Sequence, residues 1–123
     1  MHKLDLSDHW QIVLNSDNPT ALLAARELQT FLERICGKRL AIHAQPEGHN
    51  PSFYLCFLEG DEDGFEWHRD NGDICITGFS PRGLLYGVYS FLEALGCCWF
   101  APGAAGEVVP QGSCFDLPDE PVR

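Results

Sequence analysis

The stretch SPRGLLYGVYSFLEALGCCWFAPGAAG, residues Ser80–Gly106, carries the densest structural signals in the chain. Ser80 followed by Pro81 is typical of a helix start, because the hydroxyl can accept from a free N–H group and proline fits the first helical position. Apolar residues then recur at helical spacing and predict one buried face: Leu84, Leu85, Val88, Phe91, Leu92 and Leu95. Gly96 is placed to end this helix.

Two glycines interrupt the same predicted helix. Gly83 and Gly87 are four residues apart and therefore lie on one side of it. A glycine inside a helix costs ~1 kcal/mol against alanine, so the pair predicts close approach by a sheet or a neighbouring domain. Arg82 lies in the first turn, where a cation opposes the helix dipole. It is either a solvated surface arginine or the partner of a carboxylate from elsewhere.

The rest of the chain predicts one sheet and one further helix. Apolar patterns predict strands at His9–Leu14, Arg39–His43, Ser52–Leu58, Phe65–Asp70 and Asp73–Gly78, with short extended pieces at Cys97–Phe100 and Glu107–Pro110. Ser52–Leu58 is apolar on both faces and should be central, and Asn71-Gly72 predicts a tight hairpin. Asn18 and Gly37 bound a helix over Pro19–Cys36. We expect an α+β two-layer sandwich, with a mostly antiparallel or mixed sheet of about five strands under two amphipathic helices. Residues 1–8 are expected to be a loose lead-in.

Two segments also carry a family resemblance. Ser80–Pro110 combines an Arg-Gly helix start, Tyr-Gly-Val-Tyr, Trp-Phe, Pro-Gly and Gly-Glu-x-Val-Pro, and Asn18–Leu40 adds Ala-Ala-Arg-Glu-Leu-Gln-x-Phe-Leu. Together they resemble the N-terminal accessory domain of large bacterial glycoside hydrolase-like proteins. That domain is similar to the alpha-glucuronidase N-terminal domain and to the second domain of family-twenty beta-hexosaminidases. The chain departs from the pattern at Cys98, where a basic residue is expected before the tryptophan.

The resemblance implies a non-catalytic domain over residues 1–115 and a linker over residues 116–123, leading to a catalytic barrel outside this chain. The partner would be that barrel of the same polypeptide, and the domain would support it and shape its sugar-binding cleft. Candidate residues at the substrate edge or domain interface are Arg82, Tyr86, Trp99 and Glu107, since tyrosine and tryptophan pair a flat apolar body with a polar tip. The alternatives are a free-standing carbohydrate-binding module and a dimerisation module.

Composition argues against several other classes. The chain has 123 residues, a net charge of −10 and only 8 Lys and Arg, which disfavours a nucleic-acid surface and an anionic membrane surface. No apolar run approaches the ~18 residues that span a bilayer. The sequence predicts no cofactor and no metal site, because it has no phosphate-binding glycine loop and its histidines are dispersed.

The acidic residues and the cysteines have plain structural interpretations. A glycosidase needs two carboxylates flanking the scissile bond, but the candidates crowd one predicted loop beside the hairpin: Glu59, Asp61, Glu62, Asp63 and Glu66. Cys36, Cys56 and Cys75 fall inside predicted helices or strands, as small buried hydrophobes do. Together with the lack of a leader, this favours reduced thiols and a cytoplasmic protein, the alternative being a secreted protein whose leader was removed.

Overall fold

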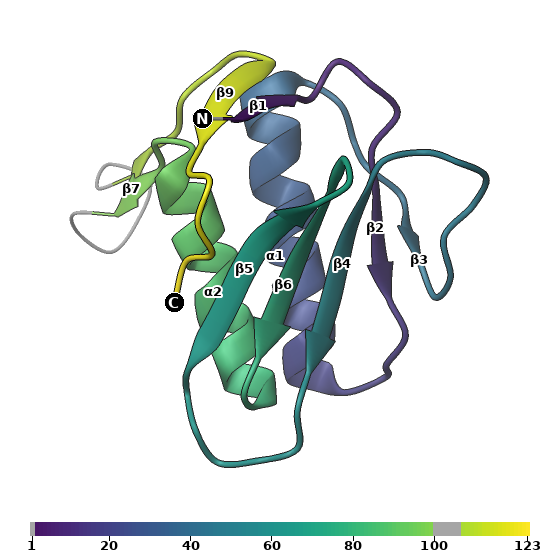
Figure 1. Ribbon diagram of the computed structural model, residues 1–123, viewed down its shortest axis with the longest axis vertical. Coiled ribbons are helices and arrows are strands. Elements are labelled where there is room, and N and C mark those ends of the chain that lie inside the picture. The colour runs from purple at the N-terminus through teal and green to yellow at the C-terminus, as the bar shows by residue number, and fades with distance from the viewer. Residues whose placement is uncertain (1, 100–106) are drawn as a thin grey trace.

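The structure is a computed structural model that describes residues 2–99 and 107–123, with His2, Trp99 and Glu107 described by their backbone alone. Both helices lie on one face of a five-stranded sheet, and the other face of the sheet is open (Figure 1). The predicted α+β two-layer sandwich is therefore confirmed. None of the described helices is long and apolar enough to cross a membrane.

The main sheet is mixed, and its strand order is β3-β2-β4-β6-β5. Its strands are β2 (Gln11–Leu14), β3 (Ile42–His43), β4 (Ser52–Phe57), β5 (Phe65–Asp70) and β6 (Asp73–Gly78). β4 is central, as its two apolar faces predict. The first four strands in this order run parallel to one another, and only β5 pairs antiparallel, with β6. Asn71 and Gly72 form the turn between β5 and β6 with positive φ angles of 49° and 91°, the conformation that this pair tolerates.

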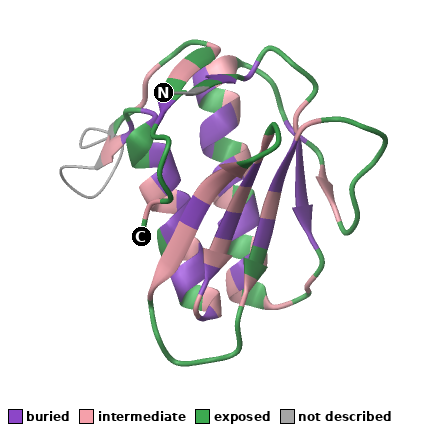
Figure 2. Cartoon of the chain, in the orientation of Figure 1, coloured by how far each residue is buried: buried purple, intermediate pink, exposed green. Residues whose placement is uncertain are grey.

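The two helices begin and end close to where the sequence predicts. Helix α1 spans Pro19–Cys36, and the Asn18 side chain accepts from the N–H groups of Thr20 and Ala21 at 2.9 and 3.1 Å. Helix α2 spans Pro81–Ala94, and the Ser80 hydroxyl accepts from the Gly83 N–H at 3.0 Å. The buried side of each helix faces the sheet (Figure 2). In α1 this side consists of Ala21, Ala24, Ala25, Leu28, Phe31, Leu32 and Ile35.

Glycines let α2 lie directly against the sheet and its loops. A β-carbon at Gly83 would overlap the carbonyl oxygen of Gly64, and one at Gly87 would come within 2.9 Å of Ile76 and 3.1 Å of Phe65. Real β-carbons essentially never approach other atoms to less than 3.0 Å, because atomic repulsion rises steeply below van der Waals contact. The predicted close approach is thus confirmed, and the partners are the sheet and the loop before β5 of the same domain.

A row of aromatic rings fills the space between the sheet and α2. Phe91 of α2 meets Phe53 of β4 at a centroid distance of 5.5 Å and Trp67 of β5 at 5.3 Å, in both cases edge to face. Trp10 lies 4.6 Å from Phe53 at the other end of the row. Edge-to-face pairs add stabilisation beyond the area they bury, because the positive ring edge meets the negative ring face. This row of rings connects α2 with β4 and β5 across the middle of the core.

The expectation of a loose lead-in is wrong. Strand β1 (His2–Asp5) pairs antiparallel with β9 (Cys114–Leu117), and this ribbon lies over one end of the helices (Figure 1). Leu4, Leu6 and Leu117 are buried in the core. The sequence of residues 1–8 looks polar, but two leucines at alternating positions suffice to anchor a strand whose partner is far away in the chain.

The C-terminal tail also packs on the domain. Val122 exchanges two backbone hydrogen bonds of 2.9 Å with Trp67 of β5, and the Arg123 guanidinium donates to the Glu66 carboxylate at 2.9 Å. The last two residues of the predicted linker are therefore held against β5 of the main sheet. The role of residues 116–123 as a linker toward a further domain stays a prediction.

Two short strands follow α2, namely β7 (Cys98–Trp99) and β8 (Glu107–Val108), which pair antiparallel. The sequence predicts extended pieces at both places. Phe100, Pro102, Gly103 and Gly106, which belong to the same predicted motif, lie outside the described residues.

Replacing Gly83 by alanine should destabilise the fold. Alanine gains ~1 kcal/mol in helix propensity, but the added methyl group collides with backbone that cannot rotate away, and overpacking costs about 1–3 kcal/mol. We expect a net fall in the unfolding free energy, measured by urea denaturation. Thr30→Ala, at an exposed site in α1, is the matched control and should leave stability unchanged or slightly raised. Equal stability of Gly83→Ala and the parent chain would contradict the close contact.

Candidate functional site

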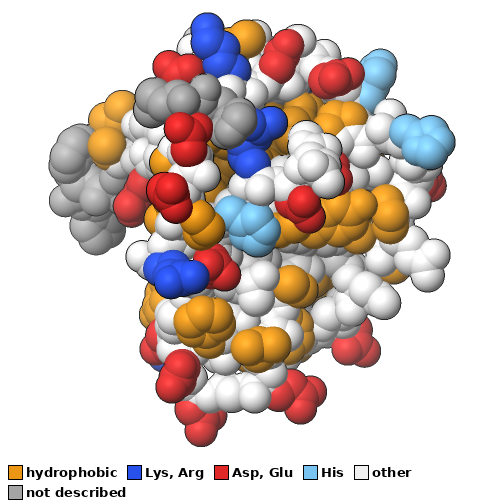
Figure 3. Space-filling view, in the orientation of Figure 1, with side chains coloured by type: hydrophobic (Ala, Val, Ile, Leu, Met, Phe, Trp, Pro, Cys, Tyr) orange, Lys and Arg blue, Asp and Glu red, His pale blue; other side chains and the backbone are white. Residues whose placement is uncertain are grey.

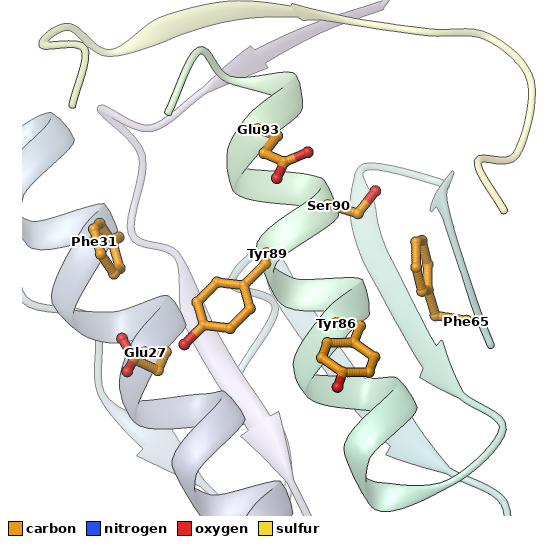
Figure 4. Close-up of a pocket in the computed structure, with 7 residues that line it drawn as sticks. All are labelled: Glu27, Phe31, Phe65, Tyr86, Tyr89, Ser90 and Glu93. Carbon is orange, nitrogen blue, oxygen red and sulfur yellow. The ribbon is translucent and has the colours of Figure 1, made fainter. Parts of the chain in front are cut away.

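An open groove of about 660 Å³ lies on the outer side of the two helices. Its lining residues come from α1, α2 and the first residue of β5, as Figure 4 shows. They are Glu27, Phe31, Phe65, Tyr86, Tyr89, Ser90 and Glu93. The groove lies on the side of α2 that faces away from the sheet, so its occupant would contact the helical layer and not the core.

Helical spacing explains why these residues meet. Tyr86, Tyr89 and Glu93 stand three and four residues apart, which places them on one side of α2. Glu27 and Phe31 are four residues apart on α1 and face them across the space between the helices (Figure 4). Phe65 reaches the groove from the sheet because Gly87 offers no side chain in its way.

Tyr89 and Glu27 connect the two helices at the centre of the groove. The Tyr89 hydroxyl donates to the Glu27 carboxylate and points toward it in Figure 4. Burial is the main cause that raises the pKa of the Tyr89 phenol above its ordinary value, and the negative charge of Glu27 and this hydrogen bond raise it further. The bond fixes the Tyr89 ring as a rigid wall of the groove.

Ser90 has a structural partner on the sheet side. The buried Trp67 donates its indole N–H to the Ser90 hydroxyl at 3.0 Å. This bond satisfies the one polar atom of a side chain that is otherwise within the core. Ser90 therefore holds α2 against β5. This bond to Trp67 and the bond from Tyr89 to Glu27 together maintain the shape of the groove.

The four residues predicted from the sequence are spread along α2 and beyond it. Arg82, in the first turn, pairs with Asp63 at 3.3 Å (Nε to Oδ1) between two substantially exposed side chains. This is the carboxylate partner that the sequence left open. Tyr86 lies one turn further on and lines the groove. Trp99 and Glu107 are opposite each other in the β7–β8 pairing, past the other end of α2, and their side chains lie outside the described part of the chain.

Most of the groove was not predicted from the sequence. Among its lining residues only Tyr86 was a candidate, and Glu27, Phe31, Phe65 and Glu93 were not. One signal was present, since Tyr86, Tyr89 and Glu93 form a stripe at helical spacing. The partners from α1 and β5 depend on tertiary packing, which local spacing does not reveal.

The acidic loop after β4 is a solvated surface feature with one ion pair. Asp61, Glu62 and Asp63 are exposed, and Asp63 pairs with Arg82. Glu66, from the same group of candidates, pairs with Arg123. Within the described residues, no group of three or more His, Cys, Asp and Glu side chains is placed to hold a metal ion.

The open face of the sheet carries two of the six free cysteines, amid a mixture of apolar, acidic and histidine side chains (Figure 3). Cys56 of β4 lies 3.3 Å from the Thr77 hydroxyl (Sγ to Oγ1), and Cys75 of β6 is half-buried. Burial is the main cause that raises the pKa of Cys75 to about 11, and Asp70, Cys56 and Asp73 add to it. A thiol with so high a pKa is a poor nucleophile at neutral pH.

The chain is similar in sequence to part of a carbohydrate-active enzyme. No known family model matches the chain. It is 35% identical over 100 residues to a probable alpha-glucuronidase A of Aspergillus oryzae, a match that covers 68% of this chain and 12% of that protein. The chain resembles one part of a glycoside hydrolase. It spans only about an eighth of the length of the curated relatives that it matches.

Solved structures share the fold at low sequence identity. A GH115 4-O-methyl-alpha-glucuronidase with specificity for decorated arabinogalactans matches with a TM-score of 0.64 and 12% identity, over 99% of this chain and 18% of that one. The GH20 beta-N-acetylhexosaminidase from Streptomyces coelicolor A3(2) matches with a TM-score of 0.58 and 20% identity, over 92% of this chain and 22% of that one. The resemblance to alpha-glucuronidase and hexosaminidase domains is thus confirmed, and the bacterial origin stays a prediction.

Tyr89 should ionise at a higher pH than tyrosine does in an unfolded chain. Its folded pKa is raised, so its contribution to stability is fully present below the unfolded pKa of about 10 and is lost as the pH rises through the folded pKa. The chain has three tyrosines, and subtracting the phenolate absorbance titration of Tyr89→Phe from that of the parent chain isolates Tyr89. Glu27→Gln should lower its pKa, because the charge and the accepting carboxylate are removed. A Tyr89 curve at the ordinary pKa would contradict the contact.

Cys75 should react more slowly with iodoacetamide than the exposed thiols of Cys56 and Cys114. With a pKa of about 11, only about a thousandth of this thiol is thiolate at pH 8, whereas Cys56 and Cys114 are exposed. Mass spectrometry of labelled peptides measures the order. Asp70→Asn should speed labelling of Cys75, and Glu66→Gln, an acid-to-amide change in the same strand, should not. Labelling of Cys75 as fast as Cys56 would rule out this environment.

Proposed function

We propose that this chain is a non-catalytic N-terminal domain of a glycoside hydrolase-like protein, which packs against and supports a following catalytic barrel. The observation that carries the proposal is the 35% identity to an alpha-glucuronidase over only 12% of that enzyme. A (β/α)₈ barrel needs ~250 residues, and this chain has 123. The chemistry of such a protein would therefore belong to a part outside this chain.

The arrangement of candidate residues fits a supporting role. Arg82 and Tyr86 lie on α2, and Trp99 and Glu107 lie just past its other end. Under this proposal, the four residues contact the barrel, where they shape the edge of its sugar-binding cleft.

The six free cysteines support a cytoplasmic location for the protein, because thiols stay reduced in that compartment.

A free-standing carbohydrate-binding module is the second candidate. The observation in its favour is an open groove lined by both the exposed Tyr86 ring and the Glu93 side chain, because sugars stack on aromatic rings and donate hydroxyls to carboxylates. This candidate predicts that the 123-residue chain binds a neutral oligosaccharide and that Tyr86→Ala abolishes the binding. A dimerisation module would instead show a mass that depends on concentration.

The size of the native protein tests the main proposal. The product made by its native cell should exceed this chain by ~250 residues or more, and alpha-glucuronidase or hexosaminidase activity should reside in the long product. Intact mass spectrometry and assays of both forms with aryl glycosides measure this. Trp99→Ala and Arg82→Ala in the long protein should lower turnover or stability.

Two results would contradict the proposal. A native product of 123 residues would leave no catalytic barrel for the domain to support. Hydrolysis of a glycoside by the 123-residue chain alone would show that the domain is itself an enzyme. Either result would contradict the proposal whichever surface of the domain contacts the barrel.

A further inference from the structure

The outer side of the helical layer presents apolar groups that the described part of the chain leaves uncovered. Tyr86 in the groove is 41% exposed, and Leu23 on α1 is 45% exposed. Leu23 lies four residues before Glu27, so it stands on the same side of α1 as the groove. Two of the four large hydrophobic side chains that are exposed in the described residues thus belong to the outer side of the helical layer.

The charge of the groove is negative. Glu27 and Glu93 line it, whereas no Lys or Arg is among the described lining residues. Arg34 lies over the Phe31 ring, 5.1 Å from its centroid, but does not line the groove. Glu93 is in the last turn of α2, which carries no basic residue, and the negative end of the helix dipole disfavours an anion there. A cation beside Glu93 would relieve this repulsion, and the tyrosine rings offer it a second attraction.

The C-terminal tail leads to this groove. Val122 pairs with Trp67, and Arg123 pairs with Glu66, which is the next residue along the strand in antiparallel register. The following position along β5 is Phe65, which lines the groove. A domain joined after Arg123 would therefore be tethered beside the groove, where a short connection raises its effective concentration.

From these observations we propose that the groove is the docking surface for the domain that follows Arg123. That domain contributes a lysine or arginine side chain next to Glu93 and apolar side chains against Tyr86 and Leu23. This inference rests on the proposed function, because it requires a further domain in the same polypeptide. It goes beyond that function in naming the surface, the residues and the chemistry of the partner.

Nitration of tyrosines by tetranitromethane tests the surface. Tyr86 should react several times more slowly in the native long polypeptide than in the 123-residue chain, because the docked domain covers it. Tyr54 serves as an internal control, since its neighbours Phe53 and Leu55 are buried toward the helices and alternation along the strand directs Tyr54 to the open face. Its reaction rate should be equal in both forms, as peptide mass spectrometry can show.

Charge reversal tests the cationic partner. Glu93→Lys in the long polypeptide should restore fast nitration of Tyr86, and Glu93→Gln should do so in part. Glu62→Lys makes the same charge change in the exposed acidic loop and should leave Tyr86 protected. Glu93 is an exposed helix residue, and circular dichroism checks that its variants keep the helices.

The outcomes separate this inference from the function on which it rests. A long native protein in which Tyr86 and Tyr54 react as in the short chain would overturn the docking surface and leave the proposed function standing. Protection of Tyr86 that survives Glu93→Lys would overturn the cationic partner. Protection of Tyr86 in the short chain by a neutral oligosaccharide would overturn docking in favour of a carbohydrate site.

Discussion

Glycines bring the backbone of α2 unusually close to the sheet and its loops, and much of the domain depends on this contact. Gly83 and Gly87 have no room for a β-carbon, and Gly78 at the end of β6 has none either. The contact sets the depth at which Phe91 enters the core and meets Phe53 and Trp67. It also fixes which side of α2 faces outward, and therefore where Tyr86 and Tyr89 lie.

The local sequence predicts most of this fold because its signals are local. Caps, helical periodicity and the Asn71-Gly72 turn act within a few residues, and each appears where expected. Strand β1 was missed because its partner, β9, lies more than a hundred residues away. The parallel pairing of β2, β4 and β6 likewise depends on long-range packing. Nothing in a six-residue apolar run distinguishes a parallel neighbour from an antiparallel one.

The candidate site was less predictable than the fold, for a related reason. Tyr86 could be singled out from its own helix, and Arg82 could be given a carboxylate partner without naming Asp63. The groove itself arises where two helices and a strand end converge, and the hydrogen bond from Tyr89 to Glu27 crosses from one helix to the other. Such a site is a property of the packing between elements. A sequence pattern within one element supplies only one wall of it.

The backbone pairing of Val122 with Trp67 has a consequence for self-association. An uncovered outer strand offers free N–H and C=O groups to other chains and can seed edge-to-edge aggregation. Here the tail occupies part of β5, and at the opposite border β3 is only two residues long. The domain thus limits strand addition at both borders of its sheet. Loss of the last few residues would cost solubility even if the core remained intact.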